Sequence, residues 1–305
     1  MTTLADDFSA VFDAHRAELH VHCYRMTGSY ADAEELTQET FLRAWRSVGR
    51  FEGRSTPRTW LYRIATNACV DFLKSHQRRA RPTASLAEIL EHEAWIEPYP
   101  DRRDPAEIVA DAETTNLYLT AVLLQLPPRQ RVALIARDVL GFDAAETAEI
   151  LGCGSVAVNS LLQRARARLS DLAVDVGGLV RPTGNPDIVR AYVDAHNRGD
   201  VDAIVELLAA DVRISMPPED PCVGVDDART FYRYLLGDDR PGDWRIVAVR
   251  ANGAPAIANY LRRPGDTVHR ALSIDVLRIS DERITGIHCF LGDGMFPAFG
   301  LELIG

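Results

Sequence analysis

Residues 51–81, FEGRSTPRTWLYRIATNACVDFLKSHQRRAR, combine a helical repeat of apolar positions with basic side chains and a tryptophan. Thr56 followed by Pro57 is a typical helix start, because a threonine hydroxyl caps backbone N–H groups and proline fits the first helical turn. The positions predicted to face a core are Leu61, Ile64, Ala65, Ala68 and Phe72. A neighbouring face holds Trp60, Arg63, Asn67 and Lys74, and the stretch ends in Arg78, Arg79 and Arg81.

An aromatic ring among cations is typical of a surface for single-stranded nucleic acid, because bases stack on the ring while cations follow the phosphates. A second interpretation stays open, in which Trp60 covers the core and the cations only keep the helix solvated. The charge distribution favours a polyanion partner for this part of the chain. Residues 40–81 hold ten basic and two acidic side chains, although the whole chain has a net charge of −10. Residues 82–128 then carry nine acids and two bases.

Residues 32–48, DAEELTQETFLRAWRSV, predict a second helix whose two faces differ. Its core face consists of Ala33, Leu36, Thr40, Phe41, Ala44 and Val48. The opposite face carries Glu35, Gln38, Glu39 and Leu42 at helical spacing. An acidic face around a leucine suits a basic partner helix, although a solvated face without a partner has the same pattern.

Residues 129–172 predict a helix, a short helix, a turn at Gly152–Gly154 and a last helix from Ser155. The last helix has an apolar stripe of Val158, Leu161, Leu162, Ala165 and Leu169. Its other face has no acid and carries Asn159, Ser160, Gln163, Arg164 and Arg166. Amides and guanidinium groups pair with base edges and phosphates, so this helix-turn-helix pattern predicts a DNA reader; an ordinary helical hairpin is the alternative.

The remaining sequence divides the chain further. Prolines among acids mark a linker over residues 82–110, and GGLVRPTGNP marks a second one near residues 174–185. Residues 186–305 predict two helices, 187–197 and 201–209, followed by strands at 245–250, 256–261, 272–279 and 284–290. Helices followed by a set of strands indicate an α+β domain.

Composition excludes several classes of protein. Hydrophobic residues make up 47% and charged residues 26%, a globular balance. No apolar run approaches the length of a membrane span, and the first residues lack a signal peptide pattern, so we expect a cytoplasmic protein without membrane contact. Five scattered cysteines without a C-x-x-C pair argue against a disulfide framework. A metal site at His20 and Cys23 is conceivable, but packing residues fit this helix better, and we expect neither a metal nor a cofactor.

The order of these motifs resembles the extracytoplasmic-function sigma factors of bacterial RNA polymerase. The resemblance rests on DAEELTQETFLRAW, FEGRSTPRTWLYRIATNACVDFL, LPPRQRVALIARDVLGF and AVNSLLQRARARL. It implies a region 2 helical bundle over residues 6–81, which binds core polymerase and the minus-10 element. It also implies a region 4 helix-turn-helix over residues 111–173, which reads the minus-35 element. Residues 186–305 resemble the SnoaL-like, ketosteroid-isomerase-like cone fold.

The resemblance also implies sites. Glu35, Gln38, Glu39 and Leu42 would dock on the β′ clamp helices of the polymerase core, whose β flap is a second expected contact. The implied minus-10 residues are Phe51, Arg54, Ser55, Arg58, Trp60, Arg63, Asn67 and Lys74. The implied minus-35 residues are Ser155, Asn159, Ser160, Gln163, Arg164 and Arg166. Gly154 stands where the family usually has a Ser or Thr cap for the recognition helix, which leaves the first base-contacting residue open.

The SnoaL-like tail is expected to regulate in cis, by contact with the sigma modules or with the linker. The candidate pocket residues are Tyr192, Trp244, Asn259, Asp275 and His288, and His196 and Tyr260 are further candidates. Asp275 could act as a general base with Tyr260 or His288 polarising a carbonyl, whereas an exposed or ion-paired Asp275 is the alternative. Leu291–Met295 is not the DGGGK-type motif of one sigma subgroup, so no function tied to that motif is transferred.

The sequence therefore favours a sigma factor that recognises promoters, melts DNA and performs no bond chemistry. Two alternatives stay open: a helix-turn-helix regulator that binds DNA without polymerase, and a ligand-binding or catalytic SnoaL-like domain fused to a DNA-targeting module. The acidic face of residues 32–48 distinguishes the sigma factor from both alternatives: a stand-alone DNA binder has no use for it, and charge reversal there should abolish core binding only if the protein is a sigma factor.

Overall fold

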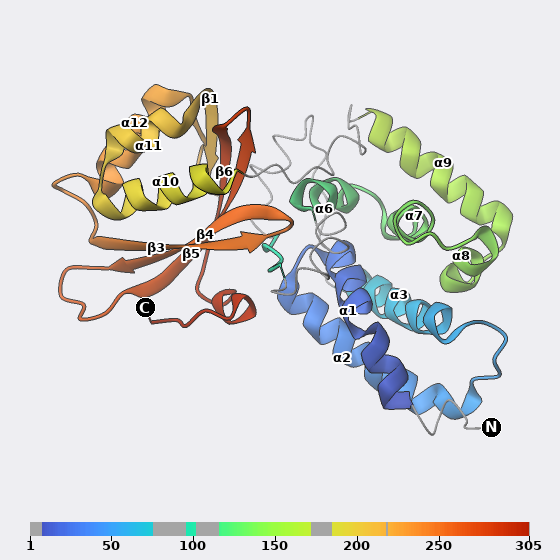
Figure 1. Cartoon of the computed structure of the whole chain (residues 1–305). Helices are drawn as coiled ribbons and strands as arrows, with labels where there is room; N and C mark the ends of the chain where they lie inside the picture. The colour runs from blue at the N-terminus through green and yellow to red at the C-terminus, as the bar shows by residue number, and fades with distance from the viewer. Residues whose placement is uncertain (1–7, 76–95, 102–115, 172–184, 218, 305) are drawn as a thin grey trace. The chain divides into compact units, whose positions relative to one another are not determined.

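The computed structural model describes residues 8–75, 96–101, 116–171, 185–217 and 219–304. The chain forms two compact units (Figure 1). The first unit contains residues 1–86 and 119–177, and the second contains residues 87–118 and 178–305. Within the described ranges no helix is long and apolar enough to cross a membrane.

The N-terminal module of the first unit consists of three helices: α1 (Phe8–Thr27), α2 (Tyr30–Ser47) and α3 (Pro57–Ser75). Ser29 caps α2, since its side chain accepts a hydrogen bond from the Asp32 N–H. The predicted cap of α3 is confirmed, because the Thr59 N–H donates to Thr56 Oγ1 at 3.1 Å and Pro57 is the first helical residue. The predicted stripe residues Leu61, Ala65 and Ala68 are buried, and Ile64 and Phe72 are half-buried.

The second module of this unit contains α6 (Leu117–Leu124), α7 (Pro128–Leu134), α8 (Ala144–Leu151) and α9 (Ser155–Asp171). A π-helical turn, Ile135–Val139, extends α7. Asp143 and Glu146 form a reciprocal capping box at the start of α8, and Gly152 ends this helix at φ 60°. The predicted stripe of α9 packs inward, with Val158, Leu162, Ala165 and Leu169 at most 6% exposed.

The second unit is an α+β domain in which α10 (Pro186–Arg198), α11 (Val201–Leu207) and α12 (Val225–Leu236) lie against one sheet (Figure 1). The strands are β1 (Leu208–Ser215), β2 (Cys222–Val223), β3 (Asp243–Ala251), β4 (Ala254–Arg262), β5 (Arg270–Ser280) and β6 (Arg283–Leu291). Their order is β2-β1-β6-β5-β4-β3, and all neighbours are antiparallel except β1 and β6.

The four strands predicted after residue 244 lie within β3 to β6, and the two predicted helices correspond to α10 and α11. The sequence reading missed β1, β2 and α12. β1 begins directly where α11 ends, and its residues Ala209–Asp211 are not the alternating apolar pattern of a strand. β2 has two residues, which is too short for any periodicity.

A piece of the first predicted linker belongs to the second unit. Residues 96–101 pair with the turn between β3 and β4, where Asn252 and Gly253 both have positive φ, as a two-residue hairpin turn requires. The Asn252 N–H donates to the Tyr99 carbonyl and the Tyr99 N–H donates to Asn252 Oδ1, both at 2.8 Å. Asp101 accepts from the Gly253 N–H at 2.9 Å and pairs with Arg250 at 3.3 Å. The tail therefore holds this linker segment by backbone and side-chain contacts.

Candidate polymerase and nucleic-acid interfaces

The predicted acidic face lies on the surface of α2. Glu35 and Gln38 are exposed, and Glu39 is half-buried beside Arg43, with 2.7 Å between the charged atoms. Leu42 is 44% exposed, and Trp45, one turn further on, is 53% exposed. Two exposed apolar side chains next to carboxylates are typical of a protein docking surface rather than a solvated face.

Trp60 lies half-buried in a cluster of aromatic rings at one end of the N-terminal module. Its ring centroid is 5.1 Å from that of Phe51 and 6.5 Å from that of Phe8. Phe8 also lies 5.5 Å from Trp45 on α2. Trp60 thus contributes to packing and also keeps part of its surface open, which combines the two interpretations that the sequence left open.

The predicted minus-10 residues beyond Trp60 lie in a loop and along α3. Residues 51–56 form an irregular segment, in which the exposed Arg54 pairs with Glu52 at 2.6 Å and Ser55 is half-buried. Arg63, Asn67 and Lys74 are exposed on α3, as the helical spacing predicted. The basic cluster Arg78, Arg79 and Arg81 lies outside the described residues.

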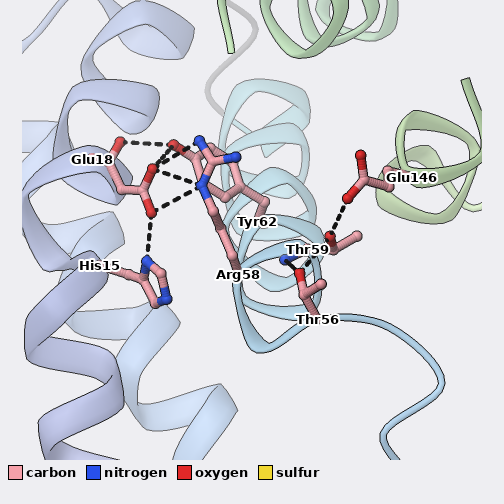
Figure 2. A network of polar contacts seen from close by, with 7 residues as sticks. All are labelled: His15, Glu18, Thr56, Arg58, Thr59, Tyr62 and Glu146. Carbon is pink, nitrogen blue, oxygen red and sulfur yellow. Dashed lines mark hydrogen bonds and ion pairs between the residues drawn. The ribbon is translucent and has the colours of Figure 1, made fainter. Parts of the chain in front are cut away.

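Arg58, another predicted minus-10 residue, is engaged by side chains from outside α3 (Figure 2). Its guanidinium group pairs with Glu18 on α1 at 2.9 Å and lies 4.4 Å from the ring centroid of Phe142. The Tyr62 hydroxyl donates to the same carboxylate at 3.2 Å, and His15 Nδ1 is 2.5 Å from its other oxygen. Burial, followed by the Glu18 charge, raises the pKa of Tyr62, so the phenol stays protonated.

The face of α9 differs from the start of α3 because it is open. Ser155, Asn159, Ser160, Gln163, Arg164 and Arg166 are all exposed. Gly154 takes the cap position, since its carbonyl accepts from the Ala157 N–H at 2.9 Å. Arg166 is the one member with an ion pair among the described contacts, to Asp138 at 2.7 Å. This pair raises the pKa of Arg166, and hydrogen bonding is its main cause.

The tail carries a buried carboxyl group where β4, β5 and β6 meet. Asp275 is 9% exposed and accepts a hydrogen bond from Ser273 Oγ at 2.9 Å, and Asn259 Nδ2 donates to Ser273 Oγ at 2.9 Å. Burial raises the pKa of Asp275 to about 6, against the opposite effect of hydrogen bonds from Ser273, Asn259 and Cys289. Asp275 is therefore a buried carboxyl rather than an exposed one, and no ion pair among the described residues includes it.

Two phenols and an imidazole from the helices are buried in the same domain core. The hydroxyl oxygens of Tyr192 on α10 and Tyr232 on α12 are 2.7 Å apart. Burial raises the pKa of both phenols, and the charge of Asp275 adds to the rise. Burial lowers the pKa of His196 to about 4, and its Nδ1 has no hydrogen-bond partner within the described part of the chain. The His196 ring centroid is 6.0 Å from that of Trp244, so these groups form one cluster.

His288 does not belong to this cluster, and the prediction that it shares a pocket with Asp275 is wrong. In the register of β5 and β6, Asp275 is opposite Cys289, whereas His288 is opposite Val276 on the other face of the sheet. His288 Nδ1 lies 2.9 Å from Ser215 Oγ on β1. Tyr260 is also turned away, since its ring lies 5.2 Å from Phe296 and its hydroxyl donates to the Glu302 carbonyl.

His20 and Cys23, the two residues of α1 considered as a metal site, contact other side chains. His20 Nε2 lies 3.4 Å from Glu34, and Cys23 is fully buried beside Cys69. Among the residues with described positions, no group of three or more His, Cys, Asp or Glu side chains could hold a metal ion.

Comparisons with known proteins agree with this arrangement. Residues 11–79 match the model of Sigma-70 region 2, residues 116–169 match Sigma-70 region 4, and residues 189–287 match a SnoaL-like domain. The chain is 40% identical over 312 residues to the ECF RNA polymerase sigma factor SigG of Mycobacterium tuberculosis H37Rv, with 97% of this chain and 84% of SigG covered.

A solved structure, the extracytoplasmic function sigma factor SigJ of Mycobacterium tuberculosis, aligns with a TM-score of 0.62 at 26% identity. The alignment covers 96% of this chain and all of the SigJ chain. The probable ECF RNA polymerase sigma factor SigI of the same organism is 28% identical over 98% of both chains.

The chain therefore belongs to the ECF sigma factors of bacterial RNA polymerase. Within that family it is a member with three folded parts: region 2 (α1–α3), region 4 (α6–α9) and a C-terminal SnoaL-like domain (α10–α12 with the sheet).

The sequence reading missed three residues at these surfaces. Trp45 could have been found, since it lies three residues after Leu42 on the same side of α2. Phe142 and Arg131 carry no such signal, because each has a contact with an element many residues away: Phe142 lies beneath Arg58 of α3, and Arg131 donates to the Met26 carbonyl of α1.

Proposed function

We propose that the exposed face of α2, with Glu35, Gln38, Glu39 and Leu42, is the surface that docks on the clamp helices of the polymerase β′ subunit. The loop at residues 51–55 and α3 then contact the minus-10 element, and the face of α9 contacts the minus-35 element. In this role the protein acts in the cytoplasm and catalyses no reaction. The observation that carries the proposal is the pair Leu42 and Trp45, which stay exposed among carboxylates next to a basic helix.

The test is core binding by a charge-reversed full-length chain. Glu35→Lys should lower the affinity for core polymerase at least tenfold, because like charges opposed across an interface cost several kcal/mol. Asp13→Lys is the matched control, an exposed acid on α1 outside this face. Equal binding by both variants in a pull-down with core polymerase would contradict the docking surface and favour a stand-alone DNA binder.

We also propose that the SnoaL-like domain modulates the sigma factor in cis through the linker. The support is the pairing of residues 96–101 with the β3–β4 turn, in which Asp101 has only 4% of its side chain exposed. A linker that joins regions 2 and 4 while bound to the tail gives the tail a direct mechanical connection to both.

Asn252→Gly tests the linker contact, since glycine keeps the positive φ of the turn and removes the side chain that accepts from the Tyr99 N–H. Asp281→Gly, in the β5–β6 turn with φ 48°, is the matched control. We expect run-off transcription from genomic fragments to change with Asn252→Gly only. The same transcription from both variants would argue against regulation through this contact.

The interior of the tail supports a second role, recognition of a small hydrogen-bonding molecule. The observation in its favour is that Asp275, Tyr192, Tyr232 and His196 place polar groups inside an apolar core. Native mass spectrometry of the full-length chain should then find a small molecule that Asp275→Asn loses and Asp281→Asn retains. A chain that carries no additional mass in either form would speak against this role.

A further inference from the structure

An acidic side chain lies within the predicted nucleic-acid face of α3. Asn67, Asp71 and Lys74 follow one another at spacings of four and three residues, so they share one side of the helix. Asp71 has 60% of its side chain exposed, and Lys74 has 71%. A carboxylate on such a face repels the phosphates that Lys74 would attract. The effect of Asp71 on DNA binding therefore depends on which cations pair with it.

Two cations lie close to the Asp71 carboxylate, one from each of two helices. Lys74 Nζ, on α3, is 3.9 Å from Asp71 Oδ1. Arg43 Nη1, on α2, is 3.5 Å from the other carboxylate oxygen, Oδ2. Because the two cations share the charge of Asp71, a stronger contact with Arg43 leaves less attraction for Lys74.

Arg43 is itself shared between two acids. Its Nε donates to Glu39 Oε1 at 2.7 Å, which is shorter than its contact with Asp71. The hydrogen bond with Glu39 is the main cause that raises the pKa of Arg43, so the guanidinium group stays charged. Glu39 therefore holds Arg43 more strongly than Asp71 does.

These contacts form one row of alternating charge on the surfaces of α2 and α3, in the order Glu39, Arg43, Asp71 and Lys74. The distances between the charged atoms lengthen along the row, from 2.7 to 3.5 and 3.9 Å. An arginine fork can bind a carboxylate through two parallel N–H groups. Arg43 can therefore engage Asp71 more strongly once Glu39 has another partner.

We propose that Arg43 and Asp71 are positioning residues that set how strongly Lys74 binds the DNA backbone. Asp71 restrains Lys74, and Arg43 competes with Lys74 for Asp71. Glu39 lies in the proposed docking face, so a basic polymerase side chain that pairs with Glu39 releases Arg43 toward Asp71. The inference rests on the proposed DNA contacts of α3, and this last step also rests on the proposed docking face.

Single-stranded DNA binding by the free full-length chain tests the row without polymerase. Glu39→Gln removes the charge that holds Arg43, and Asp13→Asn, the same charge change at an exposed acid of α1, is the matched control. A fluorescent strand of random sequence is a suitable probe, because phosphate contacts do not depend on sequence.

We expect Glu39→Gln to raise the affinity for this strand about two- to fivefold more than the control does, since exposed ion pairs have modest strength. Fluorescence anisotropy provides the measurement. Equal affinities in the two variants would contradict the proposal.

A second substitution shows whether the effect passes through Asp71. In an Asp71→Asn background, the carboxylate that Arg43 and Lys74 share is neutral. Glu39→Gln should then change the affinity no more than Asp13→Asn does. A gain that persists in this background would indicate a general effect of surface charge and would overturn the role of Asp71.

The salt dependence of the same titrations identifies the group that gains a contact. One additional phosphate contact steepens the slope of log affinity against log salt by about 0.7 for a single strand. We expect this steepening in Glu39→Gln and none when Lys74→Gln is added. An unchanged slope in Glu39→Gln would show that Lys74 is not released.

Core polymerase tests the step that begins at Glu39. Coupling of two binding events is reciprocal, so the strand should raise the affinity of the chain for core, in part through Arg43. Arg43→Gln should lower this rise about two- to fivefold. Arg46→Gln, at an exposed arginine of the same helix, is the control and should leave the rise unchanged.

Titrations of core into the chain, with and without the strand, measure this rise. An equal rise in both arginine variants would overturn the step from docking to Arg43. A chain that does not bind core at all would instead contradict the proposed docking face, so the two failures are distinguishable.

Discussion

The start of α3 and the exposed face of α9 were predicted to do similar work, since both carry polar and basic side chains for DNA. The structure separates them. On α9 all six predicted residues are exposed, whereas on α3 Arg58 is paired with Glu18 and packed against Phe142. The difference shows that the spacing of polar and basic residues in the sequence predicts which side chains share a face. It does not predict which of them are already engaged by other side chains of the folded chain.

Asp275 in the tail is a buried carboxyl group, 9% exposed, and it gives the largest expected effect. Its folded pKa, about 6, is above the ordinary 3.8, so the folded state binds this proton more tightly than the unfolded chain. The stability that protonation provides is complete below pH 3.8 and is lost as the pH rises through 6. Asp275→Asn should therefore raise the free energy of unfolding of the tail by up to about 3 kcal/mol at pH 8 and by little at pH 4.

Chemical denaturation at the two pH values measures this effect. Asp281→Asn, an exposed carboxyl in a turn, is the control and should change stability equally little at both. A gain for Asp275→Asn that does not depend on pH would mean that the carboxyl is not the buried acid described above.

The exposed face of α9 gives the next largest expected effect, on DNA affinity. Arg164→Ala should weaken binding of a promoter duplex by the polymerase complex about 10- to 100-fold, because a base contact from arginine contributes about 1–3 kcal/mol. Val156→Ala, exposed on the same helix, serves as the control. Filter binding at several salt concentrations provides the measurement, and unchanged affinity for Arg164→Ala would mean that this face does not read DNA.

Because Arg58 is paired with Glu18 in the folded protein, we predict an energetic coupling between these two residues. The pair is about one-third exposed, so a double-mutant cycle with Arg58→Ala and Glu18→Ala should give a coupling energy of about 1 kcal/mol in unfolding experiments. A coupling energy near zero would place Arg58 with the α9 residues, as a side chain free for DNA, and would remove the contrast between the two surfaces.

The smallest effect concerns Arg166, the member of the α9 face that has an ion pair among the described contacts. Asp138→Ala releases Arg166 from an exposed ion pair that contributes about 0.2–1 kcal/mol, so DNA affinity should rise by at most a few-fold at low salt. The rise should vanish in high salt, where exposed charges are screened. A loss of affinity in the same titration would show that the ion pair positions Arg166 for DNA.

Features along a single helix could be predicted from the sequence, whereas features set by pairing could not. The cap at Thr56, the inward stripe of α9 and its open face follow from spacing that one helix defines. The position of His288 depended on the register between β5 and β6, in which a shift of one residue changes the face. The contacts of Arg58 with Glu18 and of Arg131 with the Met26 carbonyl join elements far apart in the chain, and no local pattern encodes them.

The short segment at residues 96–101, held on the β3–β4 turn, divides the connection between regions 2 and 4 into two tethers. Twenty residues lie between α3 and this segment, and fourteen lie between it and residue 116. At about 3.5 Å per residue, fully extended chain spans about 70 Å on one side and about 50 Å on the other. While that attachment lasts, these two lengths are upper limits on how far the SnoaL-like domain can lie from region 2 and from region 4. A movement of either region beyond its limit requires residues 96–101 to leave the β3–β4 turn.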